Sequence, residues 1–199
     1  DPAKFPVGMK TTVDYAHSKG LKFGIYSDAA DRTCAGAFGS FGKEQIDAKQ
    51  YAAWGVDLLK YDYCHAPGDA ATAQVRYKAM GDALKASGRD ILLYMCEWGA
   101  REPWKWGSTT GSPVWRATYD TRDGWNGVQG GIGIIQSIAA MKDLWPYSGV
   151  NRFNDADMMC VGIHGTGKSS NDLVAGKPGM TQDEYRTQFA LWCMWSSQI

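Results

Sequence analysis

The stretch Trp54-Gly55-Val56-Asp57-Leu58-Leu59-Lys60-Tyr61-Asp62 decides the fold, because it passes from the end of a helix into a short apolar strand that ends in an acid. The pattern before Gly55 is helical, and the residues after it predict a buried strand over 56–62. Two further glycines stand between a helical pattern and a strand: Gly20 before 21–27, and Gly88 before 91–97. The three glycines are 35 (55 − 20) and 33 (88 − 55) residues apart. This alternation predicts a parallel sheet with helical crossovers.

The flanking helices and the second half of the chain complete this pattern. Apolar residues at helical spacing predict one face on each of two helices: Met9, Val13, Ala16 and then Ala73, Tyr77, Met80, Leu84. The second half predicts strands over 115–119 and 153–161, a helix over 132–144, a loop over 162–179 and a final helix beginning at the Thr181 capping box. No charge run or Pro-rich linker marks a boundary, so one domain over 1–199 is predicted.

Composition narrows the functional class. The 199 residues carry 21 Lys+Arg and 21 Asp+Glu, so the net charge is zero. This balance argues against nucleic acid and anionic membrane as partners, since both favour a basic surface. No apolar run approaches the roughly 20 residues of a membrane helix. The 9 Trp, 10 Tyr and 6 Phe are compatible with core packing or with stacking on sugar rings.

Polar residues gather where the predicted strands end. An acidic residue stands at the C-terminal end of each of the five strands: Asp28, Asp62, Glu97, Asp120 and the Asp155/Asp157 pair. One site ringed by strand ends is the arrangement of a (β/α)₈ barrel, whereas an open doubly wound sheet concentrates its site at one switch point. The sequence therefore favours an α/β chain of the (β/α)₈ TIM-barrel class, with about five βα units present.

Two of these acids stand near a basic residue. Lys60 and Asp62 point to the same face of a strand, so an ammonium beside the carboxylate would keep it ionised, as a nucleophile requires. Arg116 and Asp120 are four residues apart and would share a face if the strand continued. A structural salt bridge or a helix cap explains each pair as well. Two carboxyl groups with different roles are the minimum for glycoside hydrolysis.

Other motifs carry less weight. The Asp155-Ala156-Asp157 pattern is frequent without a metal, and the three histidines lack ligand spacing, so neither a metal nor a cofactor is expected. Residues 162–169, Gly-Ile-His-Gly-Thr-Gly-Lys-Ser, satisfy the P-loop pattern. A P-loop needs a helix directly after it, and Gly176, Pro178 and Gly179 leave no room for one. A surface loop is predicted there instead.

Six motifs in order resemble the α-galactosidases of glycoside hydrolase family 27, the melibiase family. They are residues 20–28 (GLKFGIYSD), 33–36 (TCAG), 54–62 (WGVDLLKYD), 96–99 (CEWG), Trp115-Arg116 with Asp120, and 154–158 (NDADM). The resemblance implies a retaining glycosidase on a (β/α)₈ barrel. It implies Asp62 as the nucleophile and Asp120 as the acid/base, acting on a galactose-containing oligosaccharide or glycoconjugate.

The resemblance also implies a sugar pocket and a disulfide. Lys60, Arg116 and Asp157 would hold sugar hydroxyls, and the pocket would be lined by Tyr26, Cys34, Cys96, Glu97, Trp98 and Met158. Glu97 and Trp98 favour a free 2-hydroxyl and hence galactose. Cys34 and Cys64 correspond to a family disulfide, which implies an oxidising compartment: secreted, periplasmic or of lysosomal type.

The chain departs from the family pattern at Phe153, Ala156 and Tyr119 and at its ends. The family's first two strands have no counterpart, so the resemblance implies strands three to seven of the barrel and truncation at both ends. The alternatives are a related specificity, α-N-acetylgalactosaminidase or β-L-arabinopyranosidase, and an inactive sugar-binding fragment. The oligomeric state is not predicted.

Overall fold

The computed structural model describes residues 3–128, 130–165 and 179–197 and divides into two compact units. The first comprises Asp1–Cys96 and Trp106–Pro113, and the second comprises Glu97–Lys105 and Val114–Ile199. Each is described by itself. In the described part of the chain, no helix combines the length and the apolar character that crossing a membrane requires.

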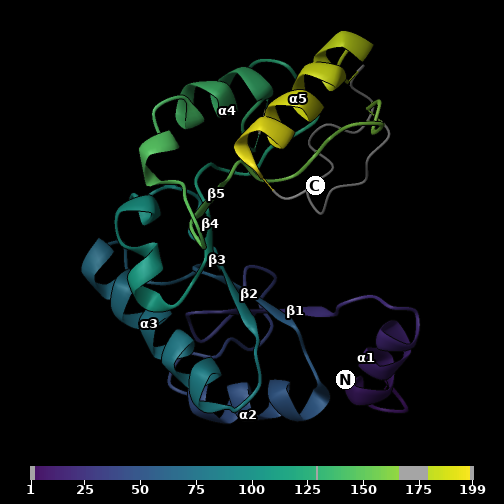
Figure 1. Ribbon diagram of the computed structural model, residues 1–199, viewed down its shortest axis with the longest axis vertical. Coiled ribbons are helices and arrows are strands. Elements are labelled where there is room, and N and C mark those ends of the chain that lie inside the picture. Colours follow the sequence, from purple (N-terminus) through teal and green to yellow (C-terminus); the bar gives the residue numbers. More distant parts are fainter. Residues whose placement is uncertain (1–2, 129, 166–178, 198–199) are drawn as a thin grey trace. The chain divides into compact units, whose positions relative to one another are not determined.

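The first unit is a parallel sheet with helical crossovers, as the glycine spacing predicts (Figure 1). Its elements are α1 (Met9–Ser18), β1 (Gly24–Asp28), α2 (Glu44–Trp54), β2 (Leu58–Asp62), α3 (Ala70–Ala86), β3 (Leu92–Cys96) and the 3₁₀ turn η2 (Gly107–Thr110). Strand β1 pairs with β2, and β2 pairs with β3. The register sets Asp28 beside Asp62 and Asp62 beside Cys96, so the polar strand ends lie at one edge.

Local sequence explains where these elements begin and end. Helix α2 ends at Gly55, whose φ of 84° is in the left-handed region that glycine tolerates best. Helix α3 begins at Asp69, whose side chain accepts a hydrogen bond from the Thr72 amide. Tyr77 of α3 is fully buried and stacks on Tyr63. A Cβ added to Gly81 would lie 1.9 Å from the Thr110 carbonyl oxygen, so glycine permits the close contact between α3 and η2.

The opposite end of the sheet is held by Asp57, directly before β2. Its carboxylate accepts a hydrogen bond from the Phe23 amide at 2.8 Å. It also lies 2.7 Å from both His17 Nε2 and Arg89 Nη2. Burial raises the pKa of Asp57, but the amide and the His17 contact outweigh it and bring the pKa to about 2. One carboxylate thus ties together α1, the start of β1 and the turn after α3.

The second unit contains a parallel pair of short strands with helices (Figure 1). Its elements are η1 (Pro103–Lys105), β4 (Val114–Arg116), α4 (Ile134–Met141), η3 (Trp145–Tyr147), β5 (Phe153–Asp155) and α5 (Gln182–Trp195). Ile134 and Met141 of α4 share a core with Tyr185 and Trp192 of α5. The predicted capping box forms: Thr181 and Glu184 bond each other's amides at the start of α5.

Two predicted strands are shorter than expected. The strand predicted over 115–119 is Val114–Arg116, and the one predicted over 153–161 is Phe153–Asp155. The physical reason for the second is visible at Asp157, whose φ of 74° is incompatible with a strand. Of the predicted loop over 162–179, residues 166–178 lie outside the described residues, and so does the Gly-Lys-Ser end of the P-loop pattern.

Candidate active site

In the first unit, Asp62 at the end of β2 is the best-positioned carboxylate. Its side chain is buried, and the residue is only 5% exposed. Tyr26 donates its hydroxyl hydrogen to Asp62 Oδ2 at 2.9 Å, and the Tyr63 amide donates to Oδ1 at 2.9 Å. Burial and the neighbouring Asp62 raise the pKa of Tyr26, so this hydroxyl stays a donor. Both carboxylate oxygens are therefore fixed in orientation by neutral donors.

The ammonium group of Lys60 does not form the pair with Asp62 that the sequence predicts. Among the described residues no ion pair joins Lys60 to Asp62, although the two point to the same face of β2. The Lys60 ammonium lies 6.0 Å from the ring centres of both Tyr26 and Tyr94, which flank it on β1 and β3. This is a cation–π arrangement. Of these two aromatic neighbours, Tyr26 was singled out from the sequence as a pocket residue and Tyr94 was not, although the residues paired with Lys60 on β1 and β3 are both aromatic.

The predicted disulfide between Cys34 and Cys64 is confirmed, with the Cα atoms 5.1 Å apart. It lies against the Asp62 carboxylate: Cys34 Sγ is 3.4 Å from Asp62 Oδ2 and 3.2 Å from the Tyr26 hydroxyl oxygen. Asp28, Cys34, Asp62 and Cys64 form one group of potential metal ligands. Two of its four members are already bonded to each other, so the geometry is that of a disulfide packed on carboxylates. A disulfide fits an oxidising compartment.

In the second unit, Asp120 is held by two guanidinium groups. Arg116 Nη2 donates to Asp120 Oδ1 at 2.9 Å, and Arg122 Nη2 donates to Oδ2 at 3.2 Å. Arg116 ends β4, and the chain then leaves the strand, so a turn rather than a continuing strand brings Asp120 back to it. The Asp120 side chain is 41% exposed, whereas Arg116 is 2% exposed. Arg122 was missed because no local pattern separates it from a surface arginine.

Arg116 also binds Asp157, at 3.0 Å from Nε to Oδ1. The Thr121 amide donates to Asp157 Oδ2 at 2.7 Å. Burial raises the pKa of Asp157 to about 6 although Arg116 opposes the shift. The structure therefore brings together three of the residues singled out from the sequence: Arg116, Asp120 and Asp157.

The other predicted pocket residues differ in exposure. Met158 is 47% exposed, and the Trp98 ring stacks on Tyr119 with centres 6.4 Å apart. Glu97 is fully buried and pairs with Arg101, and burial raises its pKa while Arg101 opposes the shift. Cys96, a free thiol, is also buried.

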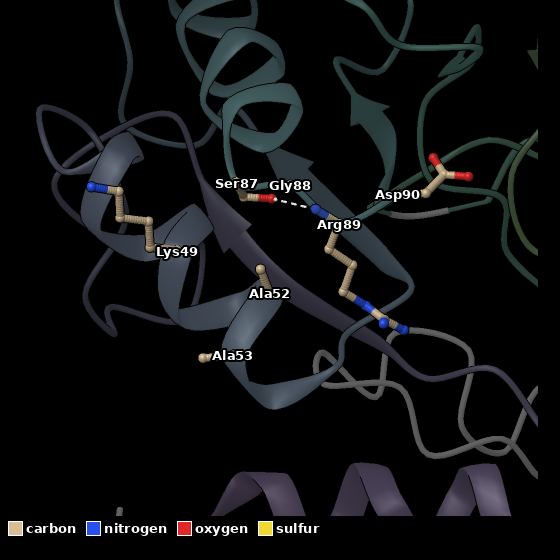
Figure 2. A pocket seen from close by; sticks show the side chains of 7 residues that line it. All are labelled: Lys49, Ala52, Ala53, Ser87, Gly88, Arg89 and Asp90. Carbon is tan, nitrogen blue, oxygen red and sulfur yellow. Dashed lines mark hydrogen bonds between the residues drawn. The ribbon is translucent and has the colours of Figure 1, made fainter.

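Figure 2 shows an open pocket in the first unit whose lining includes none of these site residues. It is lined by Lys49, Ala52 and Ala53 of α2 and by residues 87–90, which follow α3. Arg89 in this pocket forms an ion pair with Asp57 and donates a hydrogen bond to the Val56 carbonyl oxygen. The pocket has no pair of carboxyl groups, so the strand ends remain the candidate active site.

Acidic side chains at the carboxyl ends of parallel strands are the arrangement found in the active sites of α/β-barrel enzymes. The family model described as alpha galactosidase A matches residues 1–199, and the chain belongs to that family. An alpha-galactosidase of Cyamopsis tetragonoloba is 43% identical over 194 residues, which are 96% of this chain and 41% of that protein.

Solved structures agree with the sequence relatives. A Bacteroides fragilis crystal structure is 47% identical with a TM-score of 0.91, over 99% of this chain and 41% of the other. The alpha-galactosidase of Saccharomyces cerevisiae, solved with raffinose, is 30% identical with a TM-score of 0.85. The match covers 99% of this chain and 44% of the yeast chain. The predicted fold class, α/β with part of a (β/α)₈ barrel, is confirmed. The chain spans less than half the length of these relatives.

Proposed function

We propose that the full-length protein carrying this chain is a retaining α-galactosidase, with Asp62 as the nucleophile and Asp120 as the acid/base. The observation that carries the proposal is the setting of Asp62: a buried carboxylate at a strand end, with both oxygens oriented by hydrogen-bond donors. A nucleophile held in one orientation needs little reorganisation to reach the anomeric carbon. Asp120 is more exposed, as a group that exchanges protons with a leaving group and with water must be.

The proposed reaction has two displacements. In the first, an Asp62 oxygen forms a bond to the anomeric carbon while the bond to the leaving group breaks, and Asp120 gives its proton to the departing oxygen. In the second, Asp120 takes a proton from water, the water oxygen bonds to the anomeric carbon, and Asp62 leaves. Each displacement inverts the anomeric centre, so the product keeps the α configuration.

The remaining site residues are proposed to bind the sugar. Lys60, Arg116 and Asp157 present cationic and anionic groups suited to hydroxyl recognition, and Tyr26, Trp98 and Met158 offer surface that a sugar ring can contact. Cys34, Cys96 and Glu97 complete the proposed pocket, with Glu97 and Trp98 favouring galactose over its 2-acetamido derivative. An uncharged galactoside suits a chain of zero net charge. We propose that the protein is secreted or resides in a periplasmic or lysosomal-type compartment, where oxidising conditions allow the disulfide to form.

The test is carried out on the full-length protein with p-nitrophenyl α-D-galactopyranoside. Asp62→Ala should lower kcat by on the order of 10⁴ or more. The exposed Asp82→Ala, which removes a surface carboxylate paired with Lys78, is the matched control and should keep full activity. Proton NMR of the first product should show α-galactose.

Azide separates the roles of the two acids. In Asp62→Ala it should replace the nucleophile and give the β-galactosyl azide, whereas in Asp120→Ala it should give the α-galactosyl azide. Near-native activity of Asp62→Ala, or β-galactose as the first product, would refute the proposal. Aryl α-N-acetylgalactosaminide and β-L-arabinopyranoside, run in parallel, identify a related specificity if either is the better substrate.

A further inference from the structure

A second carboxyl group, Asp28, lies next to Asp62 and has no role in the mechanism above. Asp28 ends β1 and is the register partner of Asp62. It is fully buried, and its Oδ1 atom has no hydrogen-bond partner among the described residues. Its other oxygen, Oδ2, accepts the Cys64 amide at 3.0 Å. A buried carboxyl group with one unsatisfied oxygen is destabilising in itself, so its presence beside the proposed nucleophile requires a reason.

The contacts of Asp28 lead back to Asp62 through the disulfide. Asp28 accepts a hydrogen bond from the main-chain amide of Cys64, and Cys64 forms the disulfide with Cys34. Cys34 Sγ in turn touches Asp62 Oδ2 at 3.4 Å and the Tyr26 hydroxyl, the donor to that same oxygen, at 3.2 Å. The position of the Cys64 main chain therefore determines how the sulfur packs against the nucleophile and its donor.

We propose that Asp28 is a positioning residue: by accepting the Cys64 amide it sets the Cys34–Cys64 disulfide against Asp62 Oδ2 and so fixes the orientation of the nucleophile. This inference rests on the proposed function of Asp62. It gives Asp28 no part in the two displacements and an effect only through its neighbours.

The electrostatics of the site agree with this role. Burial, with a smaller contribution from the neighbouring Asp62, raises the pKa of Asp28 to about 7 against the opposing effects of the Cys64 amide and the Arg76 guanidinium. Below that pH the carboxyl group is neutral and accepts the amide hydrogen without placing a second negative charge beside Asp62. An uncharged amide side chain should therefore replace it.

Three variants of the full-length protein test the inference with p-nitrophenyl α-D-galactopyranoside. Asp28→Ala should lower kcat by about 10- to 100-fold with KM within about threefold, because the nucleophile is displaced while the sugar contacts remain. Asp28→Asn keeps an oxygen that accepts the Cys64 amide and should recover kcat to within about fivefold of the wild type. Ser27→Ala is the matched control. It removes a buried hydroxyl, bonded to Ser40, from the opposite face of the same strand and should keep kcat.

Two results overturn the inference: Asp28→Ala with wild-type kcat, or Asp28→Asn as impaired as Asp28→Ala. If Asp28→Ala does not fold, Asp28→Ser takes its place, since its hydroxyl is too short to reach the amide. Equal kcat for the Ser and Asn variants then overturns it.

A second readout needs no substrate and separates this inference from the proposed function. A phosphine reductant gives two electrons to the disulfide and becomes its oxide, while one water molecule supplies the oxide's oxygen and the two protons of the new thiols. Within residues 1–199 the free thiols rise from three to five. This opening should be about fivefold faster or more in Asp28→Ala and close to wild type in Asp28→Asn. Unchanged rates overturn the positioning role. A wild-type protein that hydrolyses no α-galactoside, with the rate difference intact, overturns the proposed function alone.

Discussion

Replacing Asp57 by Asn should weaken the protein in a pH-dependent way. The pKa of Asp57 is about 2 in the folded chain against an ordinary value of 3.8, because the Phe23 amide, His17 and Lys22 favour the charged form over the effect of burial. That difference corresponds to about 2.4 kcal/mol. The partners are partly exposed to solvent, with His17 and Arg89 each 34% exposed. Screening reduces the expected loss to about 1–2 kcal/mol at pH 7.

The sign of the pH effect follows from the depressed pKa. The stabilisation by Asp57 is complete above about pH 4 and is lost as the pH falls toward 2, because the folded state must then bind a proton that the unfolded state has already taken up. Urea unfolding of the full-length protein at pH 7, 5, 4 and 3 measures it. The difference between wild type and Asp57→Asn should shrink below pH 4. Asp82→Asn, which breaks only the exposed pair with Lys78, should change stability by less than about 0.5 kcal/mol. A difference that is constant across this pH range would refute the reasoning.

Two further predictions concern single contacts. Tyr26→Phe removes the hydroxyl that donates to Asp62 Oδ2 and should lower kcat/KM for an aryl α-galactoside about 10-fold or more, since a hydrogen bond to a charged group contributes about 1.5–3 kcal/mol; an unchanged kcat/KM would contradict the orienting role. Gly81→Ala sets a methyl group 1.9 Å from the Thr110 carbonyl oxygen and should lower the melting temperature by several degrees. Gly68→Ala, whose added Cβ would have no neighbour within 4 Å, serves as its control in the same thermal scan, and equal melting temperatures would contradict the close contact.

The fold class was predictable because its signals are local. Gly55 ends a helix through its own backbone conformation, and Tyr77 and Met80 mark the buried face of α3 by spacing alone. The strands of the second unit were predicted too long, because the chain leaves β5 at Asp155 for reasons that lie in tertiary contacts. Asp157 adopts a left-handed conformation and binds Arg116, and a single sequence gives no sign of either.

The candidate site was predictable in part for a similar reason. Alternation along a strand placed Lys60 and Asp62 on one face, and the family resemblance supplied the disulfide of Cys34 and Cys64. Alternation does not determine what a side chain bonds to. One donor to Asp62 is Tyr26 on another strand, which becomes visible only when the two strands are paired. The other is the Tyr63 amide, which depends on the backbone conformation directly after Asp62.

The sharing of one guanidinium between Asp120 and Asp157 has a consequence for how activity depends on pH. Arg116 contacts both carboxyl groups, so a proton gained by either acid changes the electrostatic potential at the other. The alkaline limb of a pH–rate profile would then depend on the coupled pair of carboxyl groups and not on a single residue. Substituting Asp157 should move that limb even if Asp157 never exchanges a proton with the substrate.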